Sequence, residues 1–447
     1  MNRIYTTLIT LLITATFAKA QEPQKLSLKD CMDYAMQHNY TIKNAQLDIL
    51  IQAAQNAQTA SVALPKVSGK AEFDYFARPQ SQFLNARTFG GATAPDVIVG
   101  FAFSVPYAAS VGLTASQLIF DGSALVALQA RKMAMELARR NERASVVSIK
   151  YGIIKSYNIL AVAYRQREIV AKSLATAKSM FKELEATGKE GFVEKIDLDR
   201  TRVQINNLQN DSASLENNVQ LLEYALKYGI GMNITQPIVI TDTAVTEHAS
   251  TAASLLTEAD NYDKVPEYAV LNTVKTLQEY NVRRFKLAAL PSLAAFGSLG
   301  TNYGSDKFAD IWKFRHYESN SVIGLQLNVP IFSGFMRTNQ LKEAKLNVDK
   351  TNNNIENLKS GIDFMAAQAR GTLKNSLIQL KSQTENLKLA NDVVDLAQRK
   401  YKAGVGSNLE VTTAQTQLLV AQNSYFSTLL NLINAEVDLK KALGLID

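Results

Sequence analysis

The chain has few of the residues that metal sites and covalent catalysis require. Its 447 residues include one cysteine, Cys31, and three histidines in unrelated segments, His38, His248 and His316. A structural zinc site needs four nitrogen or sulfur ligands at regular spacing, and these residues do not supply one. The Gly-x-Gly at 229–231 lacks the further glycine and lysine of a phosphate loop, and no nucleophile-elbow motif is present. We therefore expect no cofactor and no enzymatic activity.

Long hydrophobic runs are also missing. Beyond the N-terminus, no segment reaches the about 18 uninterrupted apolar residues of a transmembrane helix. The other way into a membrane is a closed β-barrel, whose alternating signal is much weaker. With one cysteine an internal disulfide is excluded, so an exported chain must be held by packing and oligomerisation.

The chain carries only a small excess of one charge. It has 48 Lys and Arg against 41 Asp and Glu, a net charge of +7. Because the two signs are interleaved along predicted helices, they indicate a solvated surface rather than a nucleic-acid-binding face. We expect no nucleic acid partner.

The first 20 residues have the pattern of a signal peptide. Arg3 provides the positive region, residues 8–17 the apolar core, and Ala18-Lys19-Ala20 a small-x-small cleavage site. A core of about 10 residues is too short to span a membrane. Cys31 does not adjoin this site, so a lipid anchor on the mature N-terminus is not expected.

The chain contains an internal repeat. The copies share short matching segments: Leu64–Val67 with Leu290–Leu293, and Gln117–Gly122 with Val329–Gly334. We expect a first repeat at 21–232, a linker at 233–250 and a second repeat at 251–447. Each copy has a helix, a strand pair, a very long helix and a further helix. The repeat is far longer than the about 20–50 residues of solenoid units, and it predicts a symmetric assembly rather than a pocketed enzyme.

Each copy contains two runs of alternating apolar and polar residues, within about 66–120 and about 292–332. In the first run, Val67, Ala71 and Phe73 alternate with Lys66, Lys70 and Asp74. Each run has about 10–12 residues, enough for a tilted strand to cross a bilayer. An ordinary half-buried sheet of a soluble domain is the alternative. Four strands make a poor independent domain, whereas a barrel pooled from several chains removes the exposed edges.

The predicted helices are longer than a globular domain needs. We expect them at about 27–63, 123–187, 194–230, 251–289, 335–403 and 408–443. The two longest would each measure on the order of 100 Å. Leu418, Tyr425, Leu432 and Leu439 lie seven residues apart, which is coiled-coil spacing. The predicted fold is mainly α: a long coiled-coil helical barrel with four β-strands per protomer.

The segment between the last two predicted helices carries the most specific local motif. Gly404 and Gly406 allow the backbone to turn, Ser407 or Asn408 caps the next helix, and Glu410 lies near its positive end. From Tyr401 to Val411, and on through Ala414-Gln415, the motif resembles the helix-turn-helix tip of the TolC-like outer membrane factor family. The first-copy equivalent, 188–198, is looser. The resemblance extends over essentially the whole mature chain.

This resemblance implies an architecture and a function. Three protomers would form one twelve-stranded barrel in the outer membrane of a Gram-negative bacterium, with a long periplasmic helical tunnel. The homotrimer would be the passive exit duct of a tripartite export system for small-molecule efflux. Its partners would be a periplasmic adaptor protein, an inner membrane RND or ABC transporter, and outer membrane lipid. A type I protein secretion duct and a periplasmic coiled-coil scaffold are the alternatives.

The resemblance also implies site residues. The family narrows its tunnel with acidic residues after the tip turn, so Glu410 and Asp197 are constriction candidates. Tyr401, the first residue of the motif, is the third candidate. The family's second acidic position falls at Thr413, and its basic position at Gly406, so the chain departs there. A carboxylate that merely favours the helix dipole is the simpler alternative. The candidates for docking the adaptor are the tip residues Gly188, Gly191, Gly404, Val405, Gly406 and Ser407.

Overall fold

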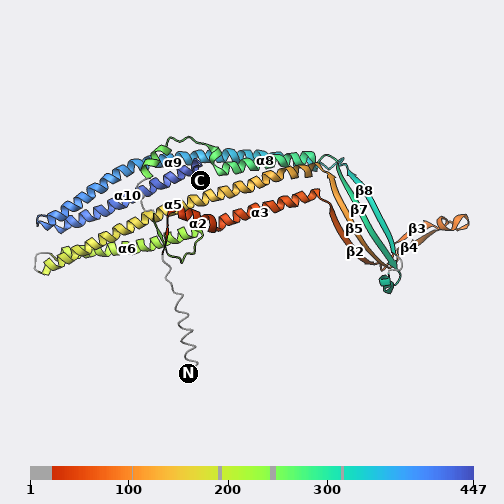
Figure 1. Ribbon diagram of the computed structural model, residues 1–447, viewed down its shortest axis with the longest axis horizontal. Helices are drawn as coiled ribbons and strands as arrows, with labels where there is room; N and C mark the ends of the chain where they lie inside the picture. The colour runs from red at the N-terminus through yellow and green to blue at the C-terminus, as the bar shows by residue number, and fades with distance from the viewer. Residues whose placement is uncertain (1–22, 103, 190–193, 242–247, 314–316, 447) are drawn as a thin grey trace, which may run out of the picture. The chain divides into compact units, whose positions relative to one another are not determined.

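The computed structural model describes residues 23–102, 104–189, 194–241, 248–313 and 317–446 (Figure 1). The expected signal peptide, 1–20, and the candidate Gly191 lie outside these residues. The chain divides into two compact units. The first comprises Met1–Ile49, Leu137–Asn272 and Asn353–Asp447, and the second Leu50–Glu136 and Thr273–Asn352. Each unit therefore draws on both predicted repeats.

Helices dominate the chain, and two of them are very long. In order they are α2 (Leu28–His38), α3 (Tyr40–Ala60), α5 (Gly122–Lys189), α6 (Lys195–Ile230), α7 (His248–Leu255), α8 (Pro266–Leu287), α9 (Met336–Lys402) and α10 (Asn408–Ala442). The 68 residues of α5 and the 67 of α9 correspond to about 100 Å each. Short helical turns are η2 (Ser61–Ala63), α4 (Arg87–Gly90), η3 (Gly91–Thr93), η5 (Tyr262–Lys264) and η6 (Phe308–Lys313).

The helix predicted at 27–63 is interrupted at Asn39. The Asn39 backbone is extended, and its Oδ1 accepts hydrogen bonds from the amides of Thr41 (2.8 Å) and Ile42 (3.2 Å). Its Nδ2 donates to the carbonyl of Gly229 at 2.7 Å, which ties the break to the end of α6. The helix predicted at 251–289 is also divided, because Pro266 starts α8 and disfavours a helical backbone before it.

Helix packing forms the core of the first unit. In α5, Ile153, Tyr157 and Leu160 lie three or four residues apart on one side of the helix and are almost fully buried. In α10, Leu432 and Leu439 are buried in the same way. By length and composition α5 also contains an 18-residue window apolar enough to cross a membrane, but half of that window is buried inside the structure. Such burial is expected of a core helix.

A small parallel strand pair adds to this core. β1 (Gln24–Leu26) pairs with β6 (Ile238–Ile240), so part of the predicted linker 233–250 is a strand. Leu26, Ile238 and Ile240 are buried in the core, and the Tyr157 hydroxyl donates to the Leu26 carbonyl at 3.2 Å. Three-residue strands are too short to show a periodic pattern in the sequence.

The second unit contains a four-stranded antiparallel sheet. β2 (Lys66–Tyr75), β5 (Tyr107–Phe120), β7 (Ser292–Ser305) and β8 (Tyr317–Asn328) lie in the order β2-β5-β7-β8. The β5–β7 pairing joins the strand pairs of the two repeats, with a bulge between Leu118 and Phe120. The alternating pattern is expected to continue to about residue 332, but β8 ends at Asn328. Pro330 has no amide to donate to a neighbouring strand. The predicted loop after β2 contains a hairpin, β3 (Ser81–Asn85) with β4 (Ile98–Ala102).

Candidate functional site

The turn between α9 and α10 is built by two glycines and a serine cap. Gly404 has a φ of +73°, and the amides of Val405 and Gly406 both donate to the carbonyl of Lys400, at 3.0 and 3.2 Å. Ser407 has extended backbone angles, and its Oγ accepts a hydrogen bond from the amide of Glu410 at 3.2 Å. Ser407 is therefore the cap of α10. Val405, at the turn, is 77% exposed.

The equivalent turn between α5 and α6 is only partly described. Gly188 is the penultimate residue of α5 rather than a turn residue, and Glu194 precedes α6 without a side-chain capping bond. Asp197 lies in the first turn of α6, where a carboxylate favours the helix dipole. Its Oδ1 lies 3.6 Å from the Arg200 guanidinium.

The two helical hairpins, α5–α6 and α9–α10, pack together near their turns. The buried members of this tip cluster are Met180, Leu184, Val394, Ala397, Val411 and Ala414. Leu198, Tyr401 and Leu418 pack against them. Burial, followed by the negative charges of Asp197 and Glu183, raises the pKa of the Tyr401 phenol. The structure thus brings two predicted constriction residues, Tyr401 and Asp197, to the same contact.

Asn408 is a site residue that the sequence does not reveal. Of the two capping candidates, Ser407 takes the role, and Asn408 is 97% buried in the first turn of α10 (3% exposed). Its Nδ2 donates to the Asp197 carbonyl at 3.2 Å and approaches Thr201 Oγ1 at 3.4 Å. Asn408 therefore links the start of α10 to the start of α6. An asparagine beside a serine cap gives no signal of such a distant partner.

Glu410 occupies a different place. Its side chain is exposed and lines a shallow groove of about 320 Å³ between α9 and α10. Apolar side chains of both helices form much of this groove, with Val393, Leu396 and Leu409 each about half exposed. Ala397 and Ala414 of the tip cluster also line this groove, so Glu410 lies at the exposed side of the cluster, whereas Tyr401 packs against its buried members.

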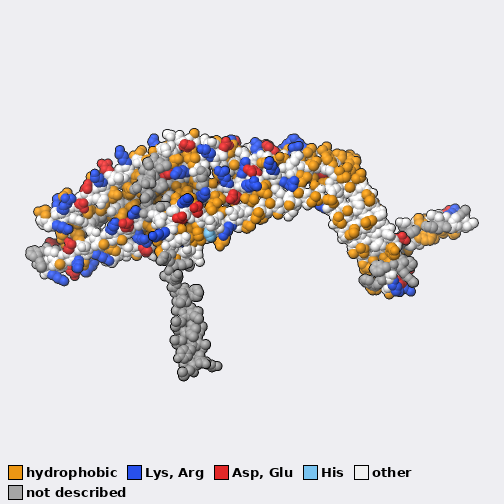
Figure 2. Space-filling view, viewed as in Figure 1, with side chains coloured by type: hydrophobic (Ala, Val, Ile, Leu, Met, Phe, Trp, Pro, Cys, Tyr) orange, Lys and Arg blue, Asp and Glu red, His pale blue; other side chains and the backbone are white. Residues whose placement is uncertain are grey.

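The sheet of the second unit has one apolar, exposed face. Its large side chains are Val67, Phe73, Val111, Leu113, Leu299, Ile323, Leu325 and Leu327, all more than half exposed. Strand register places them on one side, for example Leu113 opposite Leu299. Figure 2 shows mostly uncharged side chains over the visible part of the strands. A soluble protomer does not leave such a face in water, so the face is suited to lipid.

A row of tyrosines lies at one end of this apolar face. Tyr75 pairs with Tyr107 and Tyr303 with Tyr317 across the strands, and the rings of Tyr75 and Tyr107 stack at 4.9 Å. Amphipathic rings favour the boundary between lipid and water. The opposite face is polar: Ser68 and Thr114 share a hydrogen bond of 2.7 Å, and Lys70 pairs with Glu72 at 2.6 Å. Within the described ranges no group of His, Cys, Asp and Glu side chains is placed to hold a metal ion.

Comparison with known proteins agrees with this geometry. The family model described as "Outer membrane efflux protein" matches residues 32–232 and 276–445. The chain is 20% identical to outer membrane protein TolC of Escherichia coli K12 over 354 residues, which cover 76% of this chain and 70% of TolC. It is 23% identical over 352 residues to TtgC of Pseudomonas putida KT2440, a probable efflux pump outer membrane protein, covering 76% and 69% of the two chains.

A solved structure has the same fold. The outer membrane protein VceC of Vibrio cholerae superimposes with a TM-score of 0.69 at 16% identity, covering 93% of this chain and 96% of VceC. The family match includes both helical hairpins and the strands of both repeats. The chain therefore belongs to the outer membrane efflux protein family and is an outer membrane exit duct for efflux.

Proposed function

We propose that three copies of the chain pool their sheets into one twelve-stranded barrel, from which the helices continue as a periplasmic tunnel. The exposed apolar face of the four-stranded sheet carries this proposal, because lipid is the environment that it fits. The order of the sheet leaves β2 and β8 as its edges. Pairing these edges between copies satisfies their backbone groups and closes the barrel.

The test of the assembly is its behaviour in detergent. We expect the protein to require detergent for purification from the outer membrane and to migrate as a trimer that heating converts to a monomer. A rod that stays soluble without detergent would contradict the barrel. Deletion of the gene should also increase sensitivity to small toxic compounds if the duct serves small-molecule efflux.

The duct would work passively and depend on partners for energy. An inner membrane RND or ABC transporter would supply energy, and a periplasmic adaptor would dock at the helix turns. The support is the exposed Val405 between two glycines, because the lack of neighbouring side chains leaves room for another helix tip. Val405→Asp should reduce recovery of the adaptor after cross-linking. Val420→Asp, on the exposed side of α10 but away from the turn, is the matched control.

The contact between the two hairpins would form the closed constriction. Tyr401 and Asp197 lie at this contact, and Asn408 joins the two helix starts. In planar bilayers we expect Asp197→Ala to raise conductance by loosening the contact, whereas Glu385→Ala, an exposed carboxylate in α9, should leave it unchanged. Glu410→Ala should alter conductance if Glu410 lines the pore, and an unchanged value would remove it from the constriction.

A further inference from the structure

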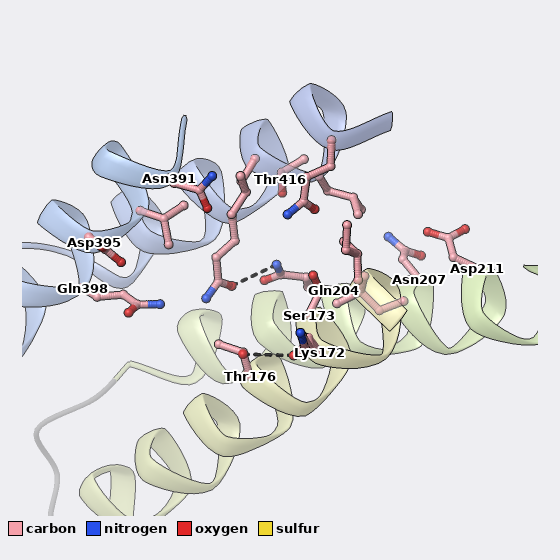
Figure 3. A pocket seen from close by; sticks show the side chains of 17 residues that line it. Lys172, Ser173, Thr176, Gln204, Asn207, Asp211, Asn391, Asp395, Gln398 and Thr416 are labelled. Atoms are coloured by element: carbon pink, nitrogen blue, oxygen red, sulfur yellow. Dashed lines mark hydrogen bonds between the residues drawn. The ribbon is translucent and has the colours of Figure 1, made fainter. Parts of the chain in front are cut away.

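Four helices of the first unit, α5, α6, α9 and α10, surround a partly open cavity at one level of their packing. The cavity has a volume of about 450 Å³, and its lining mixes amide and hydroxyl side chains with apolar ones such as Leu208, Leu418 and Leu419 (Figure 3). We call six of its amide and hydroxyl side chains the polar layer: Ser173 and Thr176 of α5, Gln204 of α6, Asn391 of α9, and Gln415 and Gln422 of α10. Thr176 and Asn391 are exposed, and the other four are half-buried. Coiled-coil cores are normally apolar, so the half-buried glutamines Gln204, Gln415 and Gln422 need a reason.

Apolar clusters lie on both sides of the polar layer. Along α10, Ala414 belongs to the tip cluster, whereas Phe426 belongs to the main core. Along α5, Thr176 and Ser173 lie between Met180 of the tip cluster and Ala163 of the main core, in a stretch that also contains buried Ala177 and Val170. The polar layer therefore separates the tip cluster from the core behind it.

The glutamine amides of the polar layer are only partly satisfied by protein atoms. Gln204 Nε2 donates to Gln415 Oε1 at 3.1 Å. Gln204 Oε1, Gln415 Nε2 and Gln422 Oε1 are buried and find no hydrogen-bond partner among the described residues. Turning both glutamine amides over would exchange the bonded and unbonded atoms and leave the same number unpaired. A partly open cavity of this size admits several water molecules, and such waters satisfy amide groups that lack a protein partner.

We propose that the polar layer is a hydrated hinge about which the tip cluster moves when the duct opens, an inference that rests on the proposed opening at the hairpin contact. Interlocked apolar side chains resist small displacements because each shift opens a void. Water-mediated hydrogen bonds re-form after a shift at little loss. The packing is therefore weakest at the polar layer, and the tip cluster moves there as one body.

The test replaces the amides by apolar groups of similar size in the full-length trimer. Gln204→Leu combined with Gln415→Leu should raise the midpoint of thermal unfolding, because it fills the layer and removes the unpaired amides. It should also lower conductance in planar bilayers several-fold and slow amide hydrogen exchange at residues 176–189 and 402–411. Gln209→Leu, on an exposed position of α6, is the control and should change none of these readouts.

A hinge predicts that the leucine variant has a higher unfolding midpoint and a lower conductance. A purely structural layer predicts a change in the unfolding midpoint alone. A raised unfolding midpoint with unchanged conductance and unchanged exchange would overturn the hinge, and so would a lowered midpoint. If the leucine variant fails to fold, Gln204→Met with Gln415→Met tests the same point, because methionine adapts to irregular space. If the wild-type protein conducts no ions, the proposed duct fails, and hydrogen exchange at the turns still decides the hinge.

Discussion

Gly404 and Gly406 lie two positions apart in the α9–α10 turn but are required for different reasons. Gly404 has a positive φ with open space around its Cα, so a side chain there would strain only the backbone. At Gly406 a Cβ would lie 2.9 Å from the Lys400 Cβ and 3.0 Å from the Tyr401 amide nitrogen. The second glycine is therefore fixed by close backbone packing. A basic side chain, which the family motif has at this position, would not fit this turn unless the backbone moved.

Replacement of these glycines should loosen the turn. We expect Gly404→Ala to cost about 1 kcal/mol, the usual penalty for a left-handed alanine, and Gly406→Ala to cost more because the backbone must move. Gly371→Ala in α9 is the opposite control: its Cβ meets nothing within 4 Å, and alanine favours a helix by about 0.5–1 kcal/mol. Thermal unfolding and proteolysis at the turn measure these changes. Equal effects at 404 and 406 would contradict the steric argument.

The buried phenol of Tyr401 should make the hairpin contact sensitive to alkaline pH. Burial and the charges of Asp197 and Glu183 raise its pKa above the ordinary value of 10.0, so folding favours the protonated form. This contribution to stability is complete below pH 10 and is lost as the pH rises through the higher, folded-state pKa. Tyr401→Phe should have nearly wild-type stability at pH 7 and a smaller decrease above pH 10. Parallel curves of unfolding midpoint against pH for the two proteins would contradict this assignment.

At the scale of single elements, the Asn39 side chain lies at the break between α2 and α3 and ties this break to the end of α6. Its Oδ1 caps α3, and its Nδ2 reaches the Gly229 carbonyl at the end of α6. Gly231 completes the junction with a φ of +77°, and a Cβ there would lie 2.7 Å from the His38 carbonyl oxygen. The break in the predicted 27–63 helix is thus set by a contact about 190 residues away.

Two substitutions separate the roles of Asn39. Asn39→Asp keeps a capping oxygen but loses the donor to Gly229, and we expect it to cost about 1 kcal/mol. Asn39→Ala loses both and should cost about 2–3 kcal/mol. The two free energies of unfolding are compared in urea. The control is Asn56→Ala, which removes two side-chain hydrogen bonds of a part-buried asparagine in α3, one to the Arg131 carbonyl and one from Gln52 Nε2. Equal losses for the two Asn39 variants would remove the α6 contact from the account.

Much of the architecture could be predicted from the period of the apolar residues and from the length over which each pattern repeats. The long helices α5 and α9 and the strands β2, β5, β7 and β8 repeat their patterns over 10 residues or more. Elements fixed by distant partners could not be predicted in this way, such as β1 pairing with β6 and Asn408 bonding to the Asp197 carbonyl. The sequence motif at the tip suggested Tyr401, Asp197 and Glu410 together as constriction candidates. Only the three-dimensional packing separates exposed Glu410 from the other two.

At the scale of the whole molecule, the duct needs one surface for lipid and another for water from the same strands. Alternation provides both, because neighbouring residues of a strand point to opposite faces. In β8, Ile323, Leu325 and Leu327 share the apolar face, whereas Gln326 lies on the polar face opposite Ala294 of β7. In the proposed barrel, a single register would thus determine both the water-facing lining and the lipid contact.

A lysine at adjacent positions of β8 tests this division directly. Leu325→Lys places a charge on the face assigned to lipid, and near the bilayer midplane such a charge costs about 2–4 kcal/mol. We expect it to reduce the amount of heat-modifiable trimer in the outer membrane fraction. Gln326→Lys adds the same side chain to the same strand but faces water, so assembly should be retained while the ion selectivity of the channel shifts toward anions. If both variants assemble equally well, or if Gln326→Lys is the one that fails, the apolar face is not the lipid contact. The proposed trimeric barrel would then require the opposite orientation of its strands.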